Sequence, residues 1–192
     1  GKTRLHAQLP GSAPLAAIVD YQRVAAKKAG VKFQLGADAN AEGILARKPD
    51  RVILATGATM VPPQWLPAAL VQSGAARDLR TAVADLLHAP GKRKGCAVIY
   101  DMDHTEMTYA AAELLHATYE RVVILTPRET IAEATAIVTH QGIVRRMREK
   151  RIAVVPLVEP RLQAGWNGGR LDTADMITGD AGAVENVTLF AY

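Results

Sequence analysis

The chain of 192 residues has one cysteine, Cys96, and few aromatic residues, which make up 5% of the sequence. A single cysteine excludes an internal disulfide and a four-cysteine metal cluster formed within the chain. Cys96 begins an apolar run, where a thiol packs as a small hydrophobic side chain. No apolar run is long enough to cross a bilayer, and the opening "GKTRLHAQLPG" lacks the apolar segment of a signal peptide. These absences predict a cytoplasmic protein without a membrane partner.

A strong excess of charge of one sign is also absent. The formal net charge is +4, with 22% charged and 49% hydrophobic residues, which is typical of a globular domain. The densest cationic stretch is "RRMREKR" at 145–151, and cations suit the end of a helix, where carbonyl groups are free. The alternative is a surface for an acidic partner. No aromatic-rich or recognised nucleic-acid motif accompanies these cations, so we expect no nucleic-acid partner.

The first half of the chain predicts an irregular set of elements. Apolar residues recur on one face of a helix that ends near Gly30. "VKFQL" (31–35) predicts a strand, "AEGILARK" a weak helix, and "RVILATGA" (51–58) a buried strand that enters a glycine turn. Residues 60–93 contain proline- and glycine-bearing stretches around a short helix, and Trp65 there is predicted to anchor packing. We interpret residues 1–91 as a partial nucleotide domain with a connection.

Residues 92–192 predict a regular alternation. "CAVIY", "RVVILTP" and "IAVVPLVE" are apolar strands, separated by helical patterns over 105–118 and about 134–149. Such alternation is typical of a parallel sheet with helical crossovers. Three further strands separated by "GG" and "GDAG" follow without helices. The sequence thus predicts an α/β, Rossmann-like FAD/NAD(P)-binding fold, with a parallel sheet flanked by helices plus a three-stranded antiparallel meander. The buried face of its first helix is predicted to carry Met107, Ala111, Leu114 and Leu115.

The turn after the first of these strands, "VIYDMDHT" at 98–105, contains no glycine. Dinucleotide sites need glycine there so that backbone amides can approach the diphosphate. Asp101 and Asp103 would also repel it, because one like-charge pair at about 4 Å costs about 4 kcal/mol at an effective dielectric near 20. The following strand ends in Thr126, Pro127 and Arg128, without a ribose-binding acid. We therefore expect no tight NAD(P)H binding, and expect Asp101, Asp103 and His104 at the carboxyl edge of the sheet.

Three other interpretations of this turn remain open. "VIYDMDHT" resembles the first motif of haloacid-dehalogenase-like Mg-dependent phosphatases, in which Asp101 would attack phosphorus and Asp103 would serve as general acid/base. A second interpretation is a metal site formed by the two acids and His104, although no spaced partners support one. The simplest alternative is that Asp and Thr side chains cap the helix that follows.

The whole chain resembles the C-terminal, nucleotide-fold region of trimethylamine-dehydrogenase-like NADH:flavin oxidoreductases. This group contains dimethylamine and histamine dehydrogenases, 2,4-dienoyl-CoA reductase and N-methyl amino-acid demethylases. The similar stretches are "GKTRLHAQLPG", "VILATGA", "VIYDMDH" and "VILTPRETIAEATAIVTHQGIVRRM...VVPLVEP". The most specific feature is the pairing of the aspartate-rich turn with "TPRETIAE".

The resemblance implies a flavin oxidoreductase that oxidises or demethylates an amine or N-methyl compound. Its barrel, FMN and 4Fe-4S cluster would lie N-terminal to these residues and outside the chain, which would have no catalytic residues of its own. Gly1, Thr56 and Gly57 match positions near the FAD or ADP of the first nucleotide domain. The expected partners are the barrel, an electron-transfer flavoprotein and a second copy of the chain. We expect no nucleotide or metal to bind this region tightly by itself.

Overall fold

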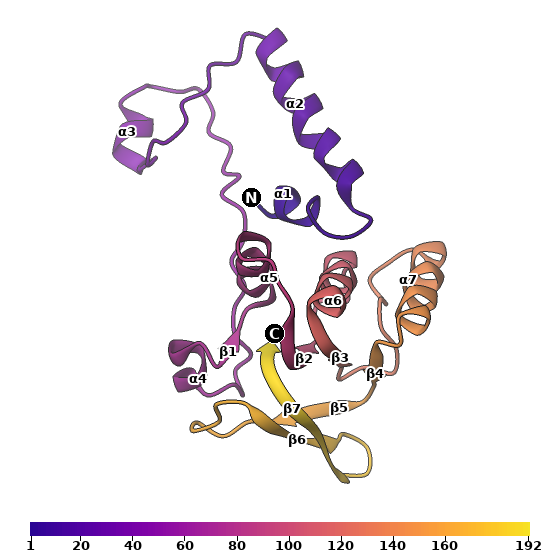
Figure 1. Cartoon of the computed structure of the whole chain (residues 1–192). Helices are drawn as coiled ribbons and strands as arrows, with labels where there is room; N and C mark the ends of the chain where they lie inside the picture. The colour runs from indigo at the N-terminus through magenta and orange to yellow at the C-terminus, as the bar shows by residue number, and fades with distance from the viewer.

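The structure, a computed structural model that describes all 192 residues, consists of a compact α/β body and an extended N-terminal arm (Figure 1). The body comprises residues 66–192, because buried side chains become frequent from Leu66 onward. The arm comprises residues 1–65 and contains four short or exposed helices: α1 (Lys2–His6), η1 (Ala13–Leu15), α2 (Ala16–Lys28) and α3 (Ala41–Leu45). No helix is both long and apolar enough to span a bilayer.

One seven-stranded sheet organises the body. Its strands are β1 (Ala76–Arg77), β2 (Arg93–Tyr100), β3 (Tyr119–Leu125), β4 (Ala153–Val155), β5 (Val158–Arg161), β6 (Gly169–Asp175) and β7 (Ala181–Ala191). The order is β4-β3-β2-β7-β6-β5, with β1 also paired to β7. Strands β1, β2, β3, β4 and β7 pair in parallel, whereas β5, β6 and β7 pair antiparallel. The predicted combination of a parallel sheet and a three-stranded meander is confirmed, with β2 in the interior of the sheet.

The two faces of the parallel strands are covered differently. The helices of the body are α4 (Ala68–Ser73), α5 (Leu79–His88), α6 (Glu106–Thr118) and α7 (Ile137–Glu149). Helices α5, α6 and α7 pack on the face that carries Ala97, Ile99 and Ile124. The opposite face packs against residues of the meander and against Leu66 and Leu70, the latter on α4. Helix α6 buries Met107, Ala111 and Leu115 as predicted, and Leu114 is half-buried.

The segment "IAVVPLVE" forms two strands rather than the single predicted one. Strand β4 ends at Val155 and β5 begins at Val158. Pro156 has no backbone N–H to donate to a neighbouring strand, and Leu157 adopts a left-handed conformation with φ 54°. The chain bends at these two residues, and this bend starts the meander on the other side of the sheet.

The prediction of two strands in the arm is wrong. Residues 31–35 and 51–56 form no strand, and Ile53 is 91% exposed. A strand needs a neighbour to pair its backbone groups, and neither segment has one in this chain. The helix near residues 15–29 does form, as α2, but Ile18 and Val24 on it are half exposed. The domain boundary at 91/92 stays a prediction. Apart from Leu9 in the arm, packing into the core begins at Leu66, before that boundary.

Candidate functional site

The turn between β2 and α6 is held together by hydrogen bonds to Asp101, a residue of the turn itself. Asp101 is buried, and its Oδ1 accepts a hydrogen bond of 3.0 Å from the His104 backbone N–H. Its Oδ2 accepts a hydrogen bond of 2.5 Å from the Tyr109 hydroxyl. Both carboxylate oxygens are therefore used inside the protein. The His104 amide, which a glycine-rich turn would leave for a phosphate, is used as well.

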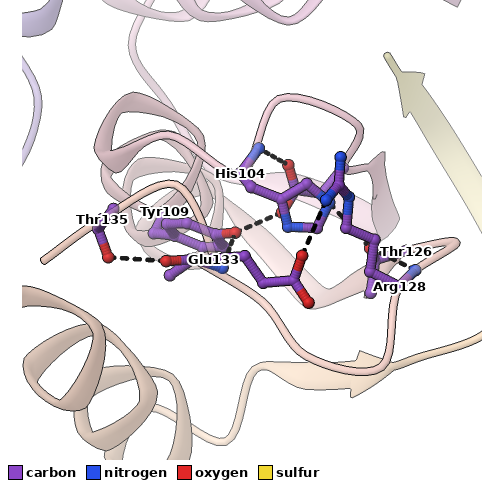
Figure 2. Close-up of polar contacts among 8 residues, drawn as sticks. His104, Tyr109, Thr126, Arg128, Glu133 and Thr135 are labelled. Atoms are coloured by element: carbon purple, nitrogen blue, oxygen red, sulfur yellow. Dashed lines mark hydrogen bonds and ion pairs between the residues drawn. The ribbon is translucent and has the colours of Figure 1, made fainter. Parts of the chain in front are cut away.

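His104 fills the space beneath this turn. It is buried and adopts a left-handed conformation with φ 52°. Its Nε2 lies 3.4 Å from Oγ1 of Thr126, which follows β3, as the close-up in Figure 2 shows. Its Nδ1 makes no hydrogen bond and lies 3.7 Å from Oδ2 of Asp101. The imidazole thus joins the carboxyl ends of β2 and β3.

Tyr109 extends the network to the loop between β3 and α7. Its hydroxyl donates to Asp101 and accepts from the Ala132 backbone N–H. Burial, followed by the neighbouring Asp101 carboxylate, raises the pKa of Tyr109, so the phenol stays a neutral donor. The hydroxyl of Thr135 donates to the Ala132 carbonyl at 2.7 Å. We refer to Asp101, His104, Tyr109, Thr126 and Ala132 as the turn cluster.

The turn cluster decides between the interpretations of the turn. Asp101 caps the turn itself, whereas α6 begins at Glu106 and its N-cap residue, Thr105, makes no side-chain cap. A nucleophilic aspartate needs a free oxygen facing substrate, but both oxygens of Asp101 are hydrogen-bonded and the side chain is buried. The geometry therefore disfavours the phosphatase interpretation. No three His, Cys, Asp or Glu side chains are arranged to hold a metal ion.

A cavity of about 260 Å³ lies beside the turn, at the carboxyl edge of the parallel sheet. It is bounded by residues 59–63 of the arm, the start of α5, the turn itself and Tyr192. The arm is held there by a 3.0 Å hydrogen bond from Arg80 Nη1 to the Ala58 carbonyl. Asp101, Asp103 and His104 follow the end of β2, and Asp101 and Asp103 line this cavity, so their predicted place at the carboxyl edge is confirmed. Ligands bind at this edge in open α/β sheets.

The residues predicted from the resemblance to lie near a flavin or ADP are in the arm. Thr56 and Gly57 are exposed in an extended segment, where Gly57 has φ 83° and open space around it. Gly1 precedes the five-residue helix α1. None of the three lines the cavity beside the turn. Their role near a flavin or ADP stays a prediction for a longer polypeptide.

Sequence reasoning missed the part played by Tyr109 and the loop after β3. The only available signal was a tyrosine on the buried face of an apolar helix, since a buried phenol hydroxyl usually finds a partner. The loop residues Arg128 and Glu133 form an ion pair of 2.9 Å. The guanidinium that follows β3 is therefore already paired with a carboxylate.

Known proteins resemble this chain in sequence and in fold. No family model matches it. It is 33% identical over 132 residues to a "Probable N-methylproline demethylase" of Rhizobium meliloti (strain 1021), covering 69% of this chain and 18% of that protein. The structure of histamine dehydrogenase from Rhizobium sp. 4-9 matches the entire chain with a TM-score of 0.80 at 19% identity, over 30% of that enzyme. The 6-hydroxypseudooxynicotine amine oxidase of Pseudomonas geniculata N1 matches it with a TM-score of 0.81 at 18% identity, over 28% of its chain.

The structural matches define the fold as the Rossmann-like nucleotide fold expected from the sequence. The matched stretch of the demethylase supports the same family. Together they confirm the resemblance to trimethylamine-dehydrogenase-like flavoproteins, for their C-terminal region only. The chain spans less than a third of each of these relatives.

Proposed function

We propose that this chain is the nucleotide-fold region of a flavin-dependent oxidoreductase that oxidises an amine or an N-methyl compound. The 33% identity with the N-methylproline demethylase carries the proposal. Two structural neighbours are also named for amine oxidation. Because the chain spans 18% of the demethylase, the proposal places FMN, the 4Fe-4S cluster and the oxidation itself in a longer polypeptide.

A test of this activity uses the complete polypeptide that contains the chain. It is mixed with N-methylproline or histamine and an artificial electron acceptor. We expect acceptor reduction with one of these amines, and with an N-methyl substrate the release of formaldehyde, because oxidation of the methyl carbon gives an iminium that water hydrolyses. Absence of turnover with every amine tested would contradict the proposal.

We infer that the body of this chain serves as a scaffold and not as a dinucleotide site. The His104 amide is already bonded to Asp101, and Asp103 adds a second carboxylate at the same edge. A diphosphate approaching this edge would meet like charge and no free turn amide at His104. The first nucleotide, FAD or ADP, would belong near Thr56 and Gly57 in the complete enzyme, as the family resemblance implies.

Calorimetric titration of the 192-residue chain with NADH and NADPH tests the scaffold role. We expect dissociation constants no tighter than about 1 mM, equivalent to about −4 kcal/mol. Micromolar binding would show that the turn still accepts a diphosphate. In a parallel assay, Mg-dependent hydrolysis of a phosphate ester that is abolished by Asp101→Asn would support the alternative phosphatase.

A further inference from the structure

Three of the five methionines of the chain line the cavity beside the turn. Met60 comes from the arm, Met102 from the turn and Met107 from α6. Thioether side chains are flexible and polarisable, and they contact the faces and edges of aromatic rings favourably. Tyr100 and Tyr192 also line the cavity, and burial is the main cause that raises the pKa of both, to about 12 for Tyr100. The walls therefore suit a flat aromatic ring.

The cavity wall also carries a hydroxyl, that of Thr108, which has no hydrogen-bond partner within the chain. Thr108 is only 3% exposed and lines the cavity, yet its side-chain oxygen makes no hydrogen bond within the chain. Thr108 can give or accept one hydrogen bond to a molecule in the cavity.

The charges around the cavity favour a cation. Asp103 is exposed at its rim and forms no ion pair, whereas Asp101 is fully hydrogen-bonded within the turn cluster. The one cationic side chain in the lining is Arg80, which donates to the Ala58 carbonyl. Two carboxylates against one guanidinium leave the lining with a net negative charge.

The size of the cavity limits the ligand. Drug-sized ligands occupy pockets of roughly 300–1,000 Å³, so about 260 Å³ suits a molecule of one or two rings and not a dinucleotide. We propose that this cavity binds a small planar aromatic amine that carries one positive charge. Its ring lies among the methionines, its ammonium group pairs with Asp103, and Thr108 supplies one hydrogen bond. This site is separate from the proposed amine oxidation and does not depend on it.

A series of indoles with the same ring and different charge tests the proposal on the 192-residue chain. The probes are tryptamine, which is cationic, tryptophol, which is neutral, and indole-3-acetate, which is anionic. In an NMR titration we expect saturable tryptamine binding, about tenfold tighter than tryptophol binding, with indole-3-acetate weakest. The shifted resonances should map to Met102, Met107 and Thr108.

Two variants separate the charge from the hydrogen bond. Asp103→Asn should bring the affinity for tryptamine to within about twofold of that for tryptophol. Thr108→Val should weaken tryptamine and tryptophol by a similar factor, and Asp20→Asn on exposed α2 is the matched control that should change neither. If Thr108→Val does not fold, Asp103→Asn decides alone.

Several results would overturn the proposal. They are the absence of saturable tryptamine binding, equal affinity for all three indoles, and shifts that map outside the cavity. Charge discrimination that survives Asp103→Asn would also overturn it. NADH binding at this cavity would contradict the scaffold role instead, so the two proposals fail in distinguishable ways.

Discussion

Two segments of similar apolar sequence have opposite structures in this molecule. "RVILAT" at 51–56 lies in the arm, exposed and without a strand, whereas "RVVILT" at 121–126 contains most of β3. Ile53 is 91% exposed, and Ile124 is fully buried between the helices and the sheet. Strand β3 pairs with β2 on one side and β4 on the other. A strand-forming sequence therefore becomes a strand only where neighbours pair its backbone and cover its side chains.

The largest expected effect on stability comes from truncating one isoleucine in each of the two segments. Ile124→Ala should lower the free energy of unfolding of the chain by about 2–5 kcal/mol, because it opens a cavity in the core. Ile53→Ala should change it by less than about 0.5 kcal/mol, because the side chain is already in water. Urea denaturation followed by circular dichroism measures both. A comparable loss in the two variants would mean that residues 51–56 are buried in solution.

The turn cluster gives a second comparison, between a buried and an exposed tyrosine. Tyr109→Phe removes the donor to Asp101 and the acceptor of the Ala132 amide. Leaving these buried groups without a partner should cost about 1–3 kcal/mol of the free energy of unfolding. Tyr21→Phe on the exposed face of α2 is the control and should be neutral. Equal stability of the two variants would show that the turn cluster does not stabilise the body.

The sequence predicted the body better than the arm, for a physical reason. The partner strands of β2 and β3 all lie within residues 92–192, so apolar alternation alone indicated the parallel sheet and the position of Asp101 at its edge. The bend at Pro156 and Leu157 was missed because an apolar run does not reveal a left-handed residue. The hydrogen bond from Tyr109 to Asp101 follows from the geometry of α6 against the turn, which composition does not specify.

The smallest expected effect is a pH dependence of the contact between α1 of the arm and the body. Leu9, just after α1, belongs to the main core, and His6 lies close enough to Glu106 of α6 to feel its charge. Burial lowers the pKa of His6, and the Glu106 carboxylate partly opposes this. The neutral imidazole is thus favoured in the docked state. Docking is strongest above the ordinary pKa of 6.5 and weakens as the pH falls through the lowered value.

Amide resonances of residues 2–9 can follow this docking between pH 7.5 and 5.5. In the unaltered chain we expect them to move toward those of a free peptide as the pH falls, while resonances of β2 and β3 stay fixed. His6→Gln should remove this pH dependence, and Glu106→Gln should enlarge it, because the carboxylate that favours protonation is gone. Docking that tightens on acidification would reverse the sign, and would mean that Glu106 outweighs burial at His6.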